Sequence, residues 1–249
     1  MPVAGSPAAV AGGAAADAEQ RNADLLARVR LANEELYSSL QSFVCNEQME
    51  RFTGSLSGES SRHIDTLETK VSFENGTEHY SDILQNKRQR ASISGVTGAW
   101  SEGEFGTLLQ QTQILLNTQP ALFRMYTDLN GTPAALYAVE ISERNSPWDL
   151  EVERHHYRIP FRTDVWVSRT TGEILKIERV STGVTSRIGI SEMRWGVTLH
   201  EVRMDGKTWL LPKTGSYAVL YESSRRREWN EMTFSNYHRY GSEVALRFQ

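Results

Sequence analysis

Few residues in this 249-residue chain have the types and the spacing that catalysis requires. The sequence contains no Gly-x-Ser-x-Gly elbow, no Gly-x-x-x-x-Gly-Lys phosphate loop and no His-Glu-x-x-His zinc motif. Its single cysteine, Cys45, could act as a nucleophile only with a histidine brought near it in space. Because Cys45 alternates with Phe43 and Met49 on the apolar side of a predicted strand, we interpret it as a buried, unreactive thiol.

Histidines and glutamates gather in one stretch, which raises a second chemical hypothesis. His155 and His156 are neighbours on a predicted strand, where side chains point to opposite faces, so they cannot chelate one metal ion together. We expect one of them outside and the other partly buried. Glu151 and Glu153 share a face and could form an acid–base pair with a partner elsewhere. A hydrolase-like enzyme with a site of such carboxylates and histidines is therefore an alternative function.

Two further features bear on binding. The run Arg225-Arg226-Arg227 lies between predicted strands, where we expect an exposed loop that could meet anionic headgroups or phosphate. His200 has the strand parity of Val202 and Met204 and faces Trp209 across a predicted hairpin. A core histidine is the default, but a polar group among aromatic residues also marks some cavities.

The composition narrows the class of protein. A net charge of −4 argues against a nucleic-acid binder, which normally carries a basic face. No apolar run reaches the ~20 residues that a membrane-spanning helix needs. A single cysteine excludes an intrachain disulfide but does not fix the compartment. No motif calls for a cofactor or a metal, and we expect a monomer.

The chain divides into a tail and one domain. Residues 1–18 consist mostly of small residues and predict a flexible, dispensable tail, and residues 19–249 predict a single domain. A helical stripe of leucines covers about 19–41. Residues 103–117 form a second helix, with Ser101 and Glu104 as its capping box. A short helix is expected over 121–126. The predicted strands are 43–52, 63–73, 78–84, 134–141, 150–159, 164–168, 173–181, 188–197, 198–204, 207–211, 217–222, 229–238 and 244–248.

Turn motifs in the sequence predict that the sheet is antiparallel. Asn75-Gly76 and Asp205-Gly206 favour two-residue hairpins, and Thr171-Gly172 ends a bulged turn between residues 164–168 and 173–181. A helix, a few strands, helices and then many strands is the order of an α+β fold, in which helices lie over one face of an antiparallel sheet.

Several segments together resemble a family of uncharacterised, exported bacterial envelope proteins. They begin with Asn46-Glu47-Gln48 and the block from Trp100 to Leu109. They continue with Trp166 to Gly172, Trp209-Leu-Leu-Pro212 and Phe234 to Tyr240. More distantly, these segments are similar to outer-membrane lipoprotein carrier and sorting proteins.

The resemblance implies a strongly curved antiparallel sheet, a half-barrel whose concave side is covered by the N-terminal helix and one or two mid-chain helices around an apolar cavity. The carriers hold acyl chains there without a cofactor and use an arginine on the sheet to latch the closed lid. In this chain the implied cavity residues are Phe105, Leu108, Leu109, His200, Val202, Met204, Trp209 and Phe234.

The resemblance also implies a function. We expect a non-enzymatic periplasmic or envelope protein that binds a lipid or a lipidated partner protein. Besides the hydrolase-like enzyme, the other alternative is a structural, partner-binding domain with a filled core. These hypotheses differ in whether the concave side is open, filled or lined by titratable groups.

Overall fold

Apolar residues at helical spacing place the N-terminal helix against a large sheet in the computed structural model. The structure describes residues 7–40, 43–57, 60–93, 96–152, 154–183 and 188–239. Within them the helices are α1 (Pro7–Leu40) and α2 (Thr107–Thr118), with a single 3-10 turn at Glu143–Asn145. The strands are β1 (Phe43–Ser55), β2 (Ser61–Glu74), β3 (Thr77–Gln85), β4 (Arg88–Gln89), β5 (Leu122–Leu129), β6 (Thr132–Ile141), β7 (Asp149–Val152), β8 (His155–Arg158), β9 (Phe161–Ser168), β10 (Ile174–Ser181), β11 (Ile190–Met204), β12 (Lys207–Tyr221) and β13 (Arg226–Arg239).

Eleven of the described strands form one sheet in the order β4-β3-β2-β1-β13-β12-β11-β10-β9-β6-β5, and β7 pairs with β8 in a separate ribbon. Every pairing in the large sheet is antiparallel, which confirms the α+β fold class. Both two-residue turns form as predicted: Asn75 and Gly76 have φ of 52° and 80°, and Asp205 and Gly206 have φ of 52° and 74°. These left-handed values suit the twist of a tight hairpin.

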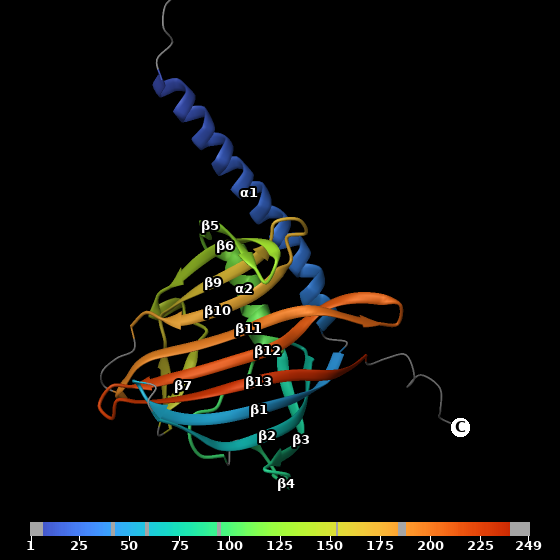
Figure 1. Cartoon of the computed structure of the whole chain (residues 1–249), viewed down its shortest axis with the longest axis vertical. Helices are drawn as coiled ribbons and strands as arrows, with labels where there is room; N and C mark the ends of the chain where they lie inside the picture. The colour runs from blue at the N-terminus through green and yellow to red at the C-terminus, as the bar shows by residue number, and fades with distance from the viewer. Residues whose placement is uncertain are drawn as a thin grey trace, which may run out of the picture.

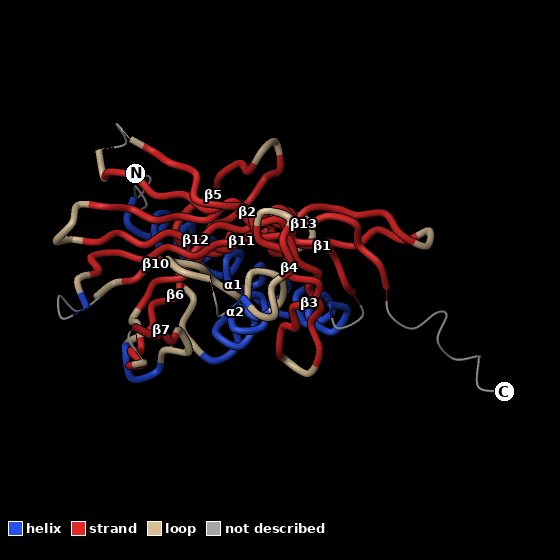
Figure 2. The backbone as a smooth tube through the Cα atoms, turned by 90° about the horizontal axis from the view of Figure 1, so that it is seen from below, coloured by secondary structure: helices blue, strands red, loops and turns tan. Residues whose placement is uncertain are grey.

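The helices lie on one side of the sheet, and both ends of the sheet bend toward them (Figure 1; Figure 2). The core fills the space between. Inward-facing strand residues such as Val165, Ile177 and Met193 are fully buried, and so are Leu108 and Leu116 of α2. Burying each such side chain contributes roughly 1.5–3 kcal/mol, so packing of this face holds the helices to the sheet.

The turn between β9 and β10 fixes α1. Arg28 donates hydrogen bonds to the carbonyls of Arg169 and Thr170, each at 3.3 Å. The amide of Asn33 reaches the carbonyl of Gly172 at 3.3 Å, and its oxygen accepts the Ile174 N–H at 3.1 Å. A Cβ at Gly172 would lie 3.1 Å from the α1 backbone, so the turn needs glycine for this close approach as well as for its φ of 82°.

The structure differs from the sequence predictions at both ends and in the middle. Residues 7–18, expected in a flexible tail, form the first turns of α1, and whether residues 1–18 are dispensable stays a prediction. The predicted strand 244–248 lies outside the described residues. The strands predicted over 188–197 and 198–204 form one strand, β11 (Ile190–Met204), and those predicted over 207–211 and 217–222 form one strand, β12 (Lys207–Tyr221). The predicted strand 150–159 divides into β7 and β8, because Arg154 takes a left-handed φ of 67° and turns the chain.

Residues 121–126 are not helical. They enter the strand β5, which pairs with β6 across a turn at Asn130-Gly131 with φ of 54° and 86°. Pairing with β6 outweighs the local preference of a short segment for helix. Among the described residues, therefore, one mid-chain helix covers the sheet and not two. Within the residues that the structure describes, no helix has both the length and the apolar content needed to cross a membrane.

Candidate functional site

A large hollow lies where two segments from outside the sheet meet one of its faces. It is a cavity of about 710 Å³ between strands β11 and β12, the chain from Gly98 to Gln111, and the stretch from Pro147 to Val152. Its aromatic lining consists of Trp100, Trp148, Trp195, Tyr217 and Tyr221, and its aliphatic lining of Leu150, Val152, Ile188, Ile190 and Val219. An aromatic and aliphatic lining of this kind suits the apolar part of a small molecule.

Strand register places the aromatic wall. Trp195 and Tyr217 are direct partners across β11 and β12, as are Ile190 and Tyr221, so their side chains share the face that carries the core. Trp148 comes from the base of the β7–β8 ribbon, where its carbonyl accepts the Ile159 N–H at 2.9 Å. Its ring centre lies 6.1 Å from that of Trp195 and 5.9 Å from that of Phe161. The two tryptophans thus join the ribbon to the sheet.

The segment before α2, Gly98–Gly106, forms one wall of the cavity, and we call it the cover segment. A buried carboxylate fastens it to the sheet. Trp195 donates its indole N–H to Glu104 at 2.7 Å, and the Ser101 hydroxyl donates to the same oxygen. The other Glu104 oxygen has no hydrogen-bond partner in the described part of the chain. Burial raises the pKa of Glu104 to about 8, opposed by the Ser101 hydrogen bond and assisted by the charge of Glu78.

A second acidic side chain, on β3 of the same sheet, caps α2. Glu78 of β3 accepts the backbone N–H groups of Gly106 at 2.7 Å and Thr107 at 2.9 Å through one oxygen, and of Gly103 at 3.0 Å through the other. The predicted capping box is therefore wrong, because the helix begins at Thr107 and the Ser101 side chain bonds Glu104 instead of a helix N–H. A long-range carboxylate does the work that a local cap would do.

Arg179 of β10 is a functional candidate that the sequence analysis missed. Its guanidinium is fully buried, 4.2 Å from the ring centre of Phe161, and donates to Gln111 of α2 at 2.7 Å and to Thr163 at 3.3 Å. Nη2 has no hydrogen-bond partner among the described residues. Burial lowers the pKa of Arg179 to about 9, so the group stays charged at neutral pH. Arg179 lies two residues after Ile177 on the same strand, so the sequence places both side chains on the same, buried face.

The eight cavity residues expected from the resemblance lie elsewhere. Phe105, Leu108, Leu109 and Phe234 are buried, and the rings of Phe105 and Phe234 lie 6.1 Å apart. His200, Val202, Met204 and Trp209 are partly exposed in the β11–β12 hairpin, whose turn end projects beyond the helices in Figure 1. Val202 pairs with Trp209 as predicted. None of the eight lines the 710 Å³ cavity, and whether they bind a ligand stays a prediction.

The groups considered for catalysis do not come together around a closed site. His155 and His156 are both exposed, so the expectation that one is partly buried is wrong: β7 and β8 pair only with each other, and the side chains of both histidines reach solvent. Glu151 faces His156 across the ribbon, and Glu153 lies outside the described residues. Within the described residues, no group of three or more His, Cys, Asp and Glu side chains could hold a metal ion.

Cys45 behaves as a core residue. It is 1% exposed, and burial raises the pKa of its thiol far above the ordinary value. Reactive cysteines have lowered pKa values and access to solvent, so its environment is that of an inert thiol.

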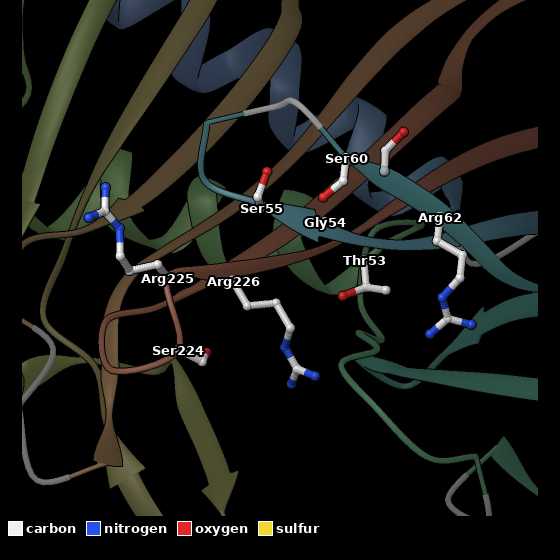
Figure 3. Close-up of a pocket in the computed structure, with 9 residues that line it drawn as sticks. Thr53, Gly54, Ser55, Ser60, Arg62, Ser224, Arg225 and Arg226 are labelled. Carbon is white, nitrogen blue, oxygen red and sulfur yellow. The ribbon is translucent and has the colours of Figure 1, made fainter.

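Arg225 and Arg226 of the arginine run line a smaller hollow of about 350 Å³, with Arg62 on its other side and several serines between (Figure 3). The side chains do not converge: Arg225 points away from Arg62 and Arg226. Arg226 is also paired with Glu228 at 3.0 Å. Exposed guanidinium groups that point in different directions do not form a preorganised anion-binding site. This hollow is therefore a weaker candidate for the functional site than the aromatic cavity.

Comparison with known proteins gives distant structural neighbours. No protein-family model matches the sequence, and no curated protein is significantly similar to it. The fold is similar to a domain described as an outer membrane lipoprotein-sorting protein domain from Vibrio parahaemolyticus, with 12% identity, a TM-score of 0.43, and coverage of 89% of this chain and 92% of that one. It is also similar to a DUF1329 family protein from Desulfovibrio piger, with 11% identity, a TM-score of 0.44, and coverage of 90% and 92%.

A third neighbour is the complex of MucA and MucB from Pseudomonas aeruginosa, with 9% identity, a TM-score of 0.23, and coverage of 85% and 92%. At such low identity, the function of this chain has to be argued from its own side chains.

Proposed function

We propose that this chain is a non-enzymatic binding protein of the cell envelope whose aromatic cavity holds the apolar part of a small ligand. The observation that carries the proposal is the cavity itself. Its volume of about 710 Å³ lies within the usual range of small-molecule sites, roughly 300–1,000 Å³, and aromatic and aliphatic side chains dominate its lining. Placement in the envelope rests on the resemblance of the sequence to exported proteins.

The way the cover segment is fastened supports this proposal. Glu78 of β3 accepts backbone N–H groups of the cover segment, Glu104 of the segment accepts the indole N–H of Trp195, and Arg179 ties α2 to β10. These polar contacts keep one wall of the cavity in place. Pre-organisation of this kind reduces the ordering cost of binding.

The residue set predicted from the resemblance is a second proposal for the position of an acyl chain of a lipid or a lipidated partner. Phe105 and Leu108 are fully buried between α2 and the sheet, so a ligand there requires α2 to move away. The hydrolase-like alternative has less support, because Glu151, His155 and His156 are exposed.

Native mass spectrometry of protein purified without detergent tests the proposal, followed by calorimetric titration with decyl glucoside. Ala99→Trp fills the cavity, since Ala99 lines it and is partly buried. Leu31→Trp is the matched control, because Leu31 is 70% exposed on α1. We expect Ala99→Trp to abolish binding and Leu31→Trp to leave it unchanged. Equal binding by both variants would place the ligand elsewhere, and no binding by the unaltered protein would favour a structural domain.

A further inference from the structure

The charged residues of the cavity all have one sign. Three carboxylates line it, those of Glu102, Asp149 and Glu151, and no Lys, Arg or His is found among its described lining residues. In the whole chain the two signs are nearly balanced, with 27 basic and 31 acidic residues. The local excess of negative charge is therefore a property of this site and not of the protein surface in general.

Exposure separates the charged part of the cavity from the apolar part. The three carboxylate residues are exposed, whereas Trp148, Trp195 and Tyr217 are 5–6% exposed. The carboxylates therefore lie toward solvent and the aromatic rings lie inside. Glu102 belongs to the cover segment, while Asp149 and Glu151 belong to β7, so the negative groups come from two different walls.

Two of the neighbouring cations are paired with carboxylates outside the cavity. Arg226, near Tyr221, is paired with Glu228 at 3.0 Å, and Arg51, near Gly98, is paired with Asp65 at 2.6 Å. Arg179 is fully buried, and its guanidinium packs on the rings of Trp148 and Trp195, which line the cavity.

His156 does meet one of the three carboxylates, at 2.6 Å from Asp149, and its pKa is raised by that hydrogen bond and charge. Glu151 lies across the ribbon from the same histidine, and its charge also raises the pKa of His156. Neither Glu102 nor Glu151 forms an ion pair among the described residues. His156 therefore offsets part of the negative charge on β7 and none on Glu102.

We infer that the ligand of this cavity is a cationic amphiphile, with an ammonium group held between Glu102 and Glu151 and an apolar chain among the buried aromatic rings. This inference rests on the proposed function and adds the charge of the ligand to it. Carboxylates attract the cation, and the face of Trp100, which is partly exposed, can also stabilise it.

Three probes with the same decyl chain test the inference by calorimetric titration below their micelle-forming concentrations: decyltrimethylammonium, decyl glucoside and decanoate. We expect the ammonium probe to bind roughly ten-fold more tightly than the glucoside, because exposed ion pairs contribute modestly. Added salt should narrow that difference, since the carboxylates are exposed. Decanoate should bind most weakly.

The double variant Glu102→Gln/Glu151→Gln should reduce the preference for ammonium to within about two-fold. The matched control is Glu140→Gln/Glu74→Gln, which removes two exposed carboxylates outside the cavity and should keep the full preference. Equal affinity for the ammonium probe and the glucoside would overturn the inference and leave the proposed function intact. Tightest binding of decanoate would also overturn it and would indicate that Arg179 meets the ligand. Failure of all three probes would overturn the proposed function as well.

Discussion

Replacing Glu78 tests how the cover segment and α2 are held to the sheet. The carboxylate accepts three backbone N–H groups, from Gly103, Gly106 and Thr107, at 2.7–3.0 Å. Gly106, the N-cap residue of α2, supplies no side-chain cap of its own. Glu78→Ala therefore leaves the N–H groups of Gly106 and Thr107 without an acceptor and leaves that of Gly103 with the Tyr80 hydroxyl alone, at 3.1 Å. It also removes a negative charge from the positive end of the helix dipole.

The expected loss in the free energy of unfolding follows from these contacts. A hydrogen bond to a charged group contributes about 1.5–3 kcal/mol, and loss of a helix cap costs about 0.5–2 kcal/mol. Because water can reach part of the site, the contributions do not add fully, and we expect Glu78→Ala to lower the free energy of unfolding by about 2–4 kcal/mol. Glu78→Gln keeps one oxygen for Gly106 and Thr107 and should lose about 1–2 kcal/mol.

Urea unfolding followed by circular dichroism measures both losses. Glu74→Ala is the matched control, because Glu74 is an exposed glutamate at the end of the adjacent strand β2. Its removal should change the free energy of unfolding by less than about 0.5 kcal/mol. If Glu78→Ala lowers the free energy of unfolding no more than Glu74→Ala does, the Glu78 carboxylate does not hold α2 and the cover segment to the sheet.

Three further predictions follow from buried side chains. Leu109→Ala should cost about 2–5 kcal/mol in urea unfolding, because Leu109 is 3% exposed and its loss leaves a void; a loss below about 1 kcal/mol, with weaker probe binding, would instead show a cavity under α2. Cys45, 1% exposed, should react with a thiol reagent far more slowly in the native state than in denaturant, and rapid native labelling would restore the nucleophile hypothesis. Glu104 has its pKa raised from 4.5 to about 8, so the native state keeps a proton that the unfolded state loses, and this contribution to stability falls as pH rises between these values. Glu104→Gln should therefore be more stable than the unaltered protein near pH 8 but not near pH 4.5, and parallel pH profiles of the two proteins would contradict this.

Local signals in the sequence predicted the sheet well. Asn75-Gly76 and Asp205-Gly206 specify hairpins because both turn residues tolerate left-handed φ, and alternation of apolar residues shows which strand face is buried. The strand β5 was missed because its pairing with β6 is not visible within residues 121–126. The turn at Asn130-Gly131 carried the same signal as the two correct hairpins and would have revealed it.

The candidate site was harder to predict, because its walls are far apart in the chain. Trp100, Trp148 and Trp195 meet only after the sheet has curved and the β7–β8 ribbon has packed on it. Strand parity could have placed Trp195 on the buried face together with Met193, since both are nearly inaccessible. No pattern within a short window relates that face to Trp148 or to the cover segment.

Arg179 shows why strand alternation alone does not predict which residues belong to the candidate site. It shares a face with Ile177, yet a charged residue at such a position would normally be expected in solvent, because burying a charge costs several kcal/mol. The structure offsets that cost with the ring of Phe161 and with hydrogen bonds to Thr163 and Gln111. These residues come from two other elements, β9 and α2. Gln111 also lines the aromatic cavity. The contact that makes burial of the cation tolerable therefore also positions a wall of the candidate site, so any change at Arg179 acts on the stability of the core and on the shape of the cavity together.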